Sequence, residues 1–563
     1  MEFQDSGRKS QANRTVDSGF YVQIFVASGP WETNRIRSMG AKDFQARYDA
    51  VVVGSGHNGL VAAAYLARAG KSVLVLEKNE TLGGATASER VFPDYDAWLS
   101  RYSYLVSLLP DQIVTDLGLK FQTLRRRTAS FTPYEGHGGL VLSNVDEARS
   151  QASMRQMTGS DEAWGQYEKF LELEVALAAK VWPTLLSPLQ SKQDFEGQMT
   201  STTEIEAWKS FVEEPLGRAI ERFADHDALR GLLMTDGKIG VFTHPHDPSL
   251  LQNRCFLYHV IGGGDGEWRV PKGGMRSLVN ALLESGRTKG VDYRTGCEVQ
   301  NVSVGTPCHQ VTFIVDGKPG TVEAEHVLVN AGPRTFARIM GQLWTPSTDH
   351  EGSVFKMNML LSRLPKVKAK GVTSEEAFAG SFHVDEGYAQ MQTAYEASLR
   401  GEIPNPVPGE IYCHTLTDPS ILSPELQAQG FQTLTLFGLD LPYRLFENDH
   451  DARREQVKDL FLDGLDRICD EPFRDCLALD SEGRPCIEYK SPQDIEKEVG
   501  LDQGNIFQSA PSWFYAPSSD EVGTWGVETE FPRVYRAGST ALRGGAVSGI
   551  PGHNAAMSVL GAK

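Results

Sequence analysis

Positive charge and long apolar runs are both scarce in this sequence. The 563 residues include 55 Lys and Arg against 73 Asp and Glu, a formal net charge of −18. A strongly acidic chain is a poor general partner for nucleic acid or an anionic membrane. No stretch is apolar over the roughly 20 residues needed to cross a bilayer, so membrane contact has no support in the sequence.

Paired cysteines and clustered histidines are also lacking. The seven cysteines are scattered and never form a C-x-x-C pair, which indicates reduced, structural thiols and a cytoplasmic protein. His244 and His246 are two positions apart, but Pro245 separates them and no third ligand is near in sequence. We therefore predict neither a metal site nor a redox dithiol.

Residues 1–47 are polar apart from one short apolar piece, and they lack the order of a signal peptide. Met39 stands shortly before the first predicted strand and is an alternative start. We interpret residues 1–47 as a disordered tail or an overextended start.

The most informative stretch is Tyr48–Glu77, YDAVVVGSGHNGLVAAAYLARAGKSVLVLE. It reads as a buried strand, a glycine turn of the form G-x-G-x-x-G, an amphipathic helix and a second buried strand. This pattern is typical of a Rossmann unit, in which the helix N-terminus binds a pyrophosphate. Glu77 ends the second strand, where a carboxylate accepts the ribose hydroxyls and repels the extra phosphate of NADP. The predicted cofactor contacts in this stretch are Gly54, Ser55, Gly56, Asn58, Gly59, Glu77 and Lys78.

A second glycine pair follows at Leu82–Ala85. In glutathione-reductase-like flavoproteins a pair at this place lets the backbone pass close to FAD, so Gly83, Gly84 and Ala85 narrow the predicted ligand to a flavin. No motif for covalent attachment is evident, and we expect noncovalent FAD. No second complete G-x-G-x-x-G unit follows a strand, which favours oxygen or a quinone over NADPH as the electron partner.

Four further segments carry a specific resemblance: SYLVSLL at 103–109, HVIGGGDGEWRVPKGGMRSLVNAL at 259–282, GNIF at 504–507, and the glycine-rich block at 535–556. With the first motif, they resemble the phytoene-desaturase-like branch of the flavin amine oxidase superfamily. Within it, the chain is most similar to the group of pyridine nucleotide-disulphide oxidoreductase domain-containing protein 2. The resemblance covers nearly all of 48–560 and is weak at 345–501.

The predicted fold is α/β, or α+β overall, with a glutathione-reductase-like Rossmann FAD-binding domain that is discontinuous in sequence. Segments read as strands at 297–304, 310–315 and 320–329, the last of which returns to the dinucleotide sheet. We assign 48–125, 265–345 and 520–563 to this domain. The segments 126–264 and 346–519 are assigned to an inserted substrate domain with a mixed sheet and a helical cover, for which the helical pattern at 161–233 provides the evidence.

The glycine-rich end of the chain predicts further flavin contacts. Pro551 is suited to the first turn of a final helix, whose N-terminus would face the flavin ring. The resemblance implies cofactor contacts at the strand residue Val299 and in three later segments: Ala331 and Gly332, Gly538 and Ser539, and Gly549, Ile550 and Gly552. Many relatives carry aspartate where this chain has Ser539, and a serine still bonds a phosphate or hydroxyl.

Catalytic residues are harder to select from the sequence. His553 lies near the flavin by motif position, although a residue at a helix start often contacts only phosphate or solvent. Tyr104, His244, His259 and Trp268 are candidate pocket walls, and each type is also common in packed cores. The basic run Arg125–Arg127 is interpreted as a solvated turn or phosphate-facing edge.

The sequence thus predicts an FAD-dependent enzyme that dehydrogenates CH–CH groups of an apolar small molecule, cyclic ones included, by hydride transfer to flavin N5. The alternatives are a flavin amine oxidase, a carotenoid desaturase of the phytoene type, and a non-catalytic FAD-binding interaction protein. Either a monomer or a homodimer is compatible with the sequence.

Overall fold

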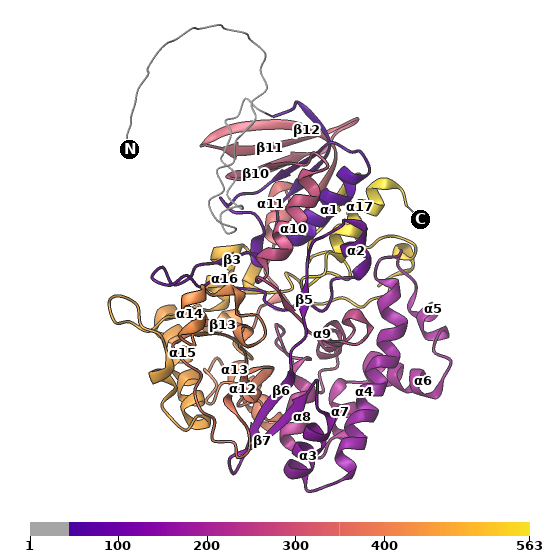
Figure 1. Cartoon of the computed structure of the whole chain (residues 1–563). Coiled ribbons are helices and arrows are strands. Elements are labelled where there is room, and N and C mark those ends of the chain that lie inside the picture. The colour runs from indigo at the N-terminus through magenta and orange to yellow at the C-terminus, as the bar shows by residue number, and fades with distance from the viewer. Residues whose placement is uncertain (1–43, 348–349, 563) are drawn as a thin grey trace, which may run out of the picture.

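The fold was analysed in a computed structural model that describes residues 44–347 and 350–562 (Figure 1). The predicted tail therefore lies almost entirely outside the described residues. The first strand, β1, begins at Arg47, one residue before the predicted Rossmann motif.

The first sheet carries the Rossmann motif. Its order is β10-β11-β12-β1-β2-β9, with β18 also paired to β12. Strands β1, β2, β9, β12 and β18 run parallel, whereas β10, β11 and β12 form an antiparallel meander. The predicted late return of a strand to this sheet is confirmed, since β12 pairs with β1 from Arg47↔Glu323 to Val53↔Val329. The strands are β1 Arg47–Val53, β2 Val73–Leu76, β9 Asp292–Arg294, β10 Cys297–Ser303, β11 His309–Val315, β12 Lys318–Val329 and β18 Val534–Arg536.

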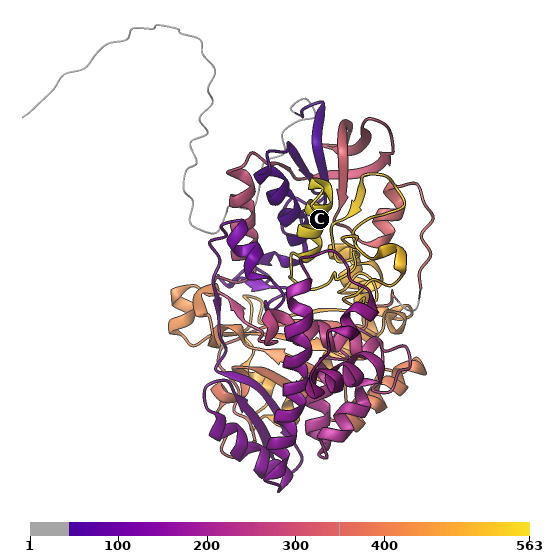
Figure 2. The same cartoon turned by 90° about the vertical axis from the view of Figure 1, so that its right-hand side faces the viewer.

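Both faces of this sheet are buried, as its continuous apolar strands require. Ala50 and Val52 of β1 pack with helices α1 (His57–Arg68), α10 (Arg276–Arg287) and α17 (Ile550–Leu560). Val51 and Val53 face the opposite cluster, formed with the meander and with α11 (Pro333–Ile339). Figure 2 shows α17, in yellow, beside the indigo elements of the chain start.

A second mixed sheet has the order β17-β13-β16-β15-β14-β6-β7. One face packs against an apolar cluster that includes Phe355 and Met357 of β13 and Phe461 of α15. Alternation along β13 turns Lys356 to the other face. The strands are β6 Thr128–Tyr134, β7 Gly138–Ser143, β13 Phe355–Leu361, β14 Ser381–Val384, β15 Gly409–Tyr412, β16 Gln432–Gly438 and β17 Ile487–Lys490.

Helices between β7 and β8 form a cover with its own apolar core, as the pattern at 161–233 predicts. Two short ribbons, β3 (Ser88–Glu89) with β4 (Leu99–Ser100) and β5 (Thr123–Leu124) with β8 (Val270–Pro271), complete the strands. The remaining helices are α2 Asp111–Asp116, α3 Glu147–Thr158, α4 Glu162–Val181, α5 Lys192–Gly197, α6 Thr202–Trp208, α7 Leu216–Phe223, α8 Asp227–Thr235, α9 Leu251–Val260, α12 Ser374–Phe378, α13 Tyr388–Leu399, α14 Pro424–Ala428, α15 His450–Ile468 and α16 Pro492–Val499.

The predicted fold class is confirmed: a Rossmann sheet is combined with a second mixed sheet and a helical cover. Apart from Arg47 at the start of β1, the strands of the first sheet fall within the predicted segments 48–125, 265–345 and 520–563, and the domain boundaries themselves stay a prediction. Within residues 44–347 and 350–562, no helix has the length and apolarity to cross a membrane.

Candidate active site

A cavity of about 720 Å³ connects the two sheets. At one end it is lined by the glycine turn after β1, and at the other by side chains of β13 to β16. Its volume lies within the range of ligand pockets in proteins. A single hollow therefore reaches from the Rossmann motif to the second sheet.

The turn between β1 and α1 is built around glycines. Gly54 has φ +92°, a left-handed backbone that strains other residues, and a Cβ there would lie 2.4 Å from the carbonyl oxygen of Asn330. A Cβ on Gly59 would lie 2.4 Å from the carbonyl oxygen of Gly54. The two glycines thus allow β1, α1 and the end of β12 to approach closely, which is the role that the motif predicts.

Asn330 fastens this turn from the neighbouring strand. Its side-chain amide donates to the carbonyl oxygens of Gly54 and Gly56, each at 3.2 Å. Sequence reasoning missed this residue, although its position directly after β12, at the carboxyl end of a parallel strand, was an available signal.

Glu77 is buried at the end of β2. Its Oε2 accepts hydrogen bonds from the backbone N–H and the hydroxyl of Ser55, both at 2.8 Å, and its Oε1 accepts from the N–H of Asn79 at 2.9 Å. The carboxylate is therefore held beside the glycine turn and lines the cavity, where it is suited to accept ribose hydroxyls.

His57 begins α1 and also lines the cavity. Burial lowers the pKa of its imidazole to about 4, so the ring is neutral. Its Nε2 is buried with no hydrogen-bond partner among the described residues. An orphaned polar atom beside an open glycine turn and a helix N-terminus fits a phosphate-bearing cofactor, so the residues present match the predicted dinucleotide.

Most of the residues predicted to bind the cofactor come together around this cavity. The cavity lining includes the glycine turn, the end of β2, the second glycine pair, Val299 of β10 and the loop residues that follow β12 and β18. The predicted residues that line it are Gly54, Ser55, Gly56, Asn58, Glu77, Lys78, Gly84, Ala85, Val299, Ala331, Gly332 and Ser539.

Other predicted contacts have packing roles, and they do not line the cavity. Gly59 and Gly538 approach the glycine turn and Asn330, and a Cβ on Gly83 would contact Val279 at 3.0 Å. The start of α17 is placed differently from the expectation: Gly549 and Gly552 lie against α1, Ile550 packs in the apolar core of the helical cover, and none of the three lines the cavity. A Cβ on Gly552 would lie only 2.0 Å from the carbonyl oxygen of Asn58. Ala546 and Val547, just before the helix, line the cavity in their place.

His553 is also placed away from the cavity. Its ring centre lies 5.1 Å from that of Tyr65 and 6.0 Å from that of Trp525, and its Nδ1 lies 2.8 Å from Oδ1 of Asn554. Burial lowers its pKa. This position between two aromatic rings argues against the predicted role of His553 in catalysis.

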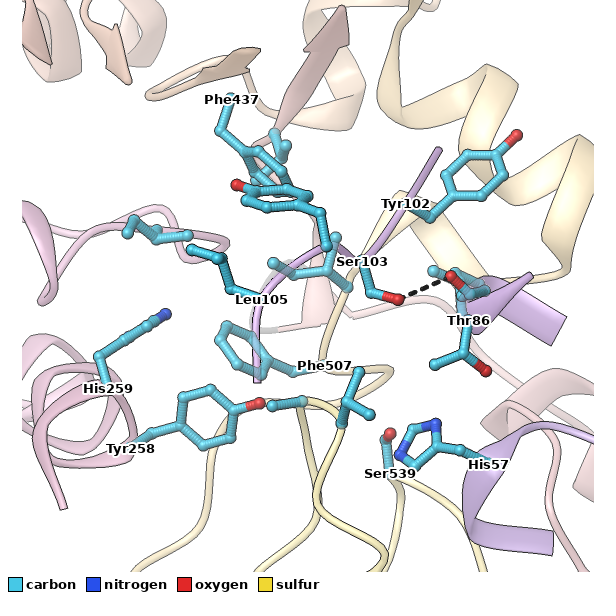
Figure 3. Close-up of a pocket in the computed structure, with 18 of the residues that line it drawn as sticks. His57, Thr86, Tyr102, Ser103, Leu105, Tyr258, His259, Phe437, Phe507 and Ser539 are labelled. Carbon is cyan, nitrogen blue, oxygen red and sulfur yellow. Dashed lines mark hydrogen bonds between the residues drawn. The ribbon is translucent and has the colours of Figure 1, made fainter. Parts of the chain in front are cut away.

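Three of the four candidate wall residues line the cavity: Tyr104, His259 and Trp268. The indole N–H of Trp268 donates to the backbone carbonyl of His259 at 2.9 Å. Figure 3 shows His259 and Phe437 facing the same hollow as Ser539 and His57. The ring centre of the fourth candidate, His244, lies 5.2 Å from that of Tyr395, with the rings tilted by 44°, and His244 does not line the cavity.

The wall formed by the second sheet carries ionisable side chains that sequence reasoning missed. Lys356, His383 and Glu410 are all nearly fully buried, and each lines the cavity. Arg126 joins them, with its Nη1 donating to the hydroxyl of Ser381 at 3.2 Å. Arg126 is therefore buried, which corrects its interpretation as part of a solvated turn.

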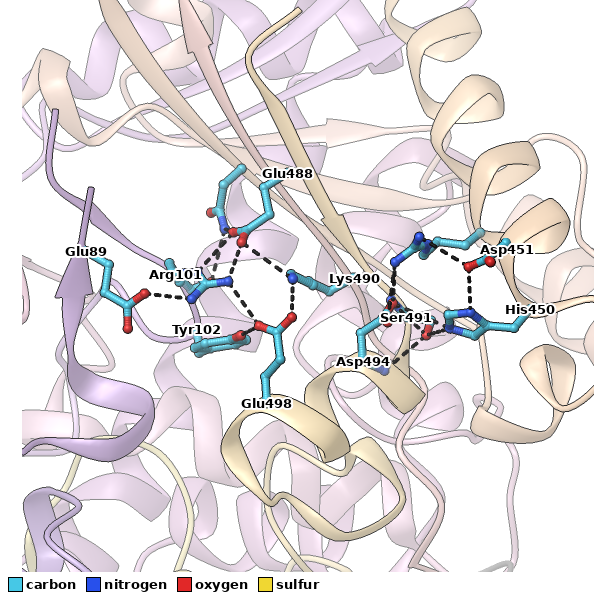
Figure 4. A network of polar contacts seen from close by, with 12 residues as sticks. Glu89, Arg101, Tyr102, His450, Asp451, Glu488, Lys490, Ser491, Asp494 and Glu498 are labelled. Atoms are coloured by element: carbon cyan, nitrogen blue, oxygen red, sulfur yellow. Dashed lines mark hydrogen bonds and ion pairs between the residues drawn. The ribbon is translucent and has the colours of Figure 1, made fainter. Parts of the chain in front are cut away.

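A polar network holds the segment that leads to Tyr104 (Figure 4). Arg101 donates to Glu89 at 2.7 Å, to Glu498 at 3.0 Å and through Nε to Glu488 at 3.2 Å. These acids come from β3, α16 and β17. The network thus connects β3, which follows the second glycine pair, to β17 at the edge of the second sheet.

The described part of the chain contains neither a disulfide nor a cluster of metal-ligating side chains. All seven cysteines are free thiols, and six of them are buried. In residues 44–347 and 350–562, no group of three His, Cys, Asp or Glu side chains is placed to hold a metal ion.

Comparisons with known proteins agree with this geometry. Residues 52–111 match the model of the NAD(P)-binding Rossmann-like domain. An uncharacterized protein of Mycobacterium tuberculosis is 42% identical, with 92% of this chain and 98% of that protein covered. Pyridine nucleotide-disulfide oxidoreductase domain-containing protein 2 of Rattus norvegicus is 30% identical over 93% of this chain and 95% of its own length. The chain belongs to this family.

The pyridine nucleotide-disulfide oxidoreductase domain-containing protein 2 family lies in the superfamily of FAD-dependent amine oxidases and desaturases, as the resemblance predicts. A carotenoid 3,4-desaturase of Haloarcula japonica is 24% identical over 50% of this chain and 55% of its own length. Cyclohexylamine oxidase of Brevibacterium oxydans shares the fold, with a TM-score of 0.52 at 14% identity over 91% of this chain and 98% of that one. A putrescine oxidase variant gives the same TM-score at 18% identity over 92% and 99%.

Proposed function

We propose that this protein binds FAD noncovalently and dehydrogenates a CH–CH group of a small, largely apolar molecule. The observation that carries the proposal is the single cavity, which joins the dinucleotide turn at His57 and Ser539 to the second-sheet wall at Phe437. A cofactor held by the turn and a molecule held by the wall would share one chamber, so that the reacting atoms meet without an intervening protein layer.

When bound, FAD would accept a hydride from one substrate carbon, and the proton lost from the neighbouring carbon would pass to a basic group in the cavity or to water, which leaves a C=C bond. The protein's own contribution is to position and to exclude water. Asn330 and Glu77 fix the turn and the ribose-binding carboxylate. The rings of Tyr104, Phe437 and Trp268 surround the substrate end with apolar surface. Oxygen or a quinone is the proposed final electron acceptor.

The CH–CH specificity finds support in the name of one relative, the carotenoid 3,4-desaturase, which describes desaturation of carbon. Amine oxidation is the second candidate, and a specific observation favours it. Glu174, Asp236 and Glu410 all line the cavity, and burial raises the pKa of each carboxyl. Repulsion from Asp236 adds to the shift at Glu174, and repulsion from Glu386 adds to the shifts at Asp236 and Glu410. A cationic amine would relieve that repulsion.

The test is anaerobic reduction of the purified protein, followed at the flavin absorbance near about 450 nm. The panel contains cyclic ketones and acids, amines of the same ring size, and a polyene in detergent. Bleaching by a ketone, acid or polyene, with a product two hydrogens lighter, supports the dehydrogenase. Bleaching by amines alone would reverse the ranking of the two candidates. A Glu77→Ala variant serves as the cofactor-binding control.

A colourless protein that cannot be reconstituted with FAD would contradict the proposed function altogether. A yellow protein that only dithionite reduces would also count against turnover, and would favour a binding role for the flavin. The first result would count against the glycine turn as the cofactor site. The second would count against the second-sheet wall as the substrate site.

A further inference from the structure

Four side chains form a row across the wall of the cavity. The strand register places Lys356 of β13 opposite Phe437 of β16, Phe437 opposite Glu410 of β15, and Glu410 opposite His383 of β14. Directly opposed residues point to the same face of a sheet, and all four line the cavity. Because strands lie about 4.8 Å apart, the row extends over roughly 14 Å.

Lys356 is the unusual member of this row. Its side chain is only 1% exposed, and its Nζ lies 4.0 Å from the ring centre of Phe437 and 4.2 Å from that of Tyr104. Among the described residues, Nζ has no hydrogen-bond partner. A buried amino group without a protein partner is costly, so a water, an ion or a polar group of a ligand is needed to complete it.

The neighbours of Lys356 add hydrogen-bond donors to this wall. Burial, followed by the charge of Glu386, raises the pKa of Glu410 to about 8, so its carboxyl is largely protonated at neutral pH. Burial alone would lower the pKa of His383, but the carboxylate of Glu386 raises it above its ordinary value. Arg126 supplies a guanidinium 5.8 Å from the ring centre of Tyr412. His383 is already paired with the carboxylate of Glu386. The groups left to face a ligand are therefore the protonated carboxyl of Glu410, the amino group of Lys356 and the guanidinium of Arg126, all of them hydrogen-bond donors that suit an anion.

We propose that this row recognises an anionic group of the substrate, a carboxylate, with Lys356 as its anchor. The rings of Phe437 and Tyr104 would then contact the carbon skeleton next to the carboxylate. This inference rests on the proposed function, because it names the substrate class of the same cavity: an apolar skeleton that carries one acid group. Burial lowers the pKa of Lys356 well below its usual range, and a carboxylate bound next to Nζ would restore the ammonium charge in a setting of low dielectric, where the ion pair is strong.

The test compares three probes that share one ring: cyclohexanecarboxylate, cyclohexanecarboxamide and cyclohexylamine. Each is titrated into the FAD-loaded protein at pH 7.5, and binding is measured by calorimetry and by the change in flavin absorbance. We expect the carboxylate to bind at least ~10-fold more tightly than the other two, as a charge-assisted hydrogen bond implies. Preference for the amine, or three affinities within ~3-fold of each other, would overturn the inference.

Variants test whether the preference for the carboxylate probe arises from the row of four side chains. Lys356→Met keeps the length of the side chain but removes the amino group, and should erase the preference for the carboxylate while leaving FAD affinity unchanged. Lys120→Met removes an exposed lysine and should change neither quantity. An unchanged preference in Lys356→Met would refute the anchor role. If that variant fails to fold, Lys356→Gln takes its place. The comparison of the three probes on the unaltered protein tests the inference without any variant.

Failure of this inference is distinguishable from failure of the proposed function. A protein that cannot be loaded with FAD contradicts the proposed function, yet calorimetry on that protein still reports whether the wall prefers the carboxylate. A yellow protein that a substrate reduces, but that binds cyclohexylamine most tightly, contradicts only the anionic anchor. In that case Glu410 and the other buried acids would recognise the substrate.

Discussion

The side-chain amide nitrogen of Asn330 lies 3.2 Å from the carbonyl oxygen of Gly54. A second contact, to the carbonyl oxygen of Gly56, has the same length. The residue after β12 therefore clamps the turn that follows β1, although 276 positions separate Asn330 from Gly54 in the chain. The shape of the dinucleotide turn depends on this clamp as well as on its own glycines.

Replacing Asn330 by alanine should weaken FAD binding. The variant loses both hydrogen bonds to the turn and leaves two carbonyl oxygens without their partner, which costs about 1–3 kcal/mol. We expect a ~10-fold or greater rise in the FAD dissociation constant, measured by fluorescence titration of the apoprotein. Asn301→Ala changes an exposed asparagine on β10 and should leave FAD affinity unaltered. Equal FAD affinities in the two variants would show that the clamp has no influence on the cofactor.

Glu77→Gln tests the ribose-binding carboxylate. The glutamine amide has a single acceptor oxygen. It therefore loses some of the hydrogen bonds that Ser55 and Asn79 donate to the two carboxylate oxygens of Glu77. FAD affinity should fall by ~10-fold or more, because charge-assisted hydrogen bonds become neutral ones. Glu80→Gln alters an exposed neighbour of the same sign and is the matched control. A Glu77→Gln protein that holds FAD as tightly as the control would contradict the assignment.

Gly552→Ala should destabilise the protein by about 1–3 kcal/mol, as overpacking of a closely fitted contact does. The new Cβ would lie 2.0 Å from the carbonyl oxygen of Asn58, so α17 must move away from α1. Thermal unfolding measures the effect. Gly165→Ala in α4 is the control, because its Cβ would meet no atom within 4 Å and alanine favours the helix. A melting temperature unchanged by Gly552→Ala would show that the two helices tolerate a wider separation.

Glu410→Gln should make stability less dependent on pH. The pKa of Glu410 is raised by burial and by Glu386 from 4.5 to about 8 in the folded protein. Between these values the unfolded chain has lost a proton that the folded chain retains, so rising pH favours unfolding. The unaltered protein should therefore lose on the order of 3 kcal/mol relative to Glu410→Gln between pH 5 and pH 8.

Urea unfolding at several pH values measures this difference. Glu482→Gln removes an exposed carboxyl and should follow the unaltered protein at every pH. Parallel stability curves for the unaltered protein and Glu410→Gln would mean that the Glu410 carboxyl is already ionised in the folded state.

The Rossmann end of the site could be predicted because its chemistry is local in sequence. The turn, helix and strand of Tyr48–Glu77 are contiguous, and each position has a role that only a few residue types can fill. The strand pattern HVLVN likewise shows that 326–330 returns to a buried sheet. The motif could not reveal that Asn330 reaches back to the turn, since that contact depends on which strand lies next to β1.

The second-sheet wall could not be predicted for a related reason. Lys356, Glu410 and His383 stand in three strands far apart in sequence, and only the register brings them into one row. A shift of register by one residue would turn every one of these side chains to the opposite face. The position of His553 differs from the expectation for another reason: a helix start was expected to face the cofactor, whereas α17 packs its first turn against α1.

The contact between α1 and α17 also affects when the site can form during synthesis. Helix α1 leaves the ribosome early with its apolar face uncovered, and the residues of α17 that cover it are translated only after the whole second sheet. The nascent chain must therefore hold an unfinished dinucleotide fold through most of its elongation. We therefore expect stable cofactor loading to follow completion of the chain, because an incomplete fold leaves the apolar face of α1 exposed during synthesis.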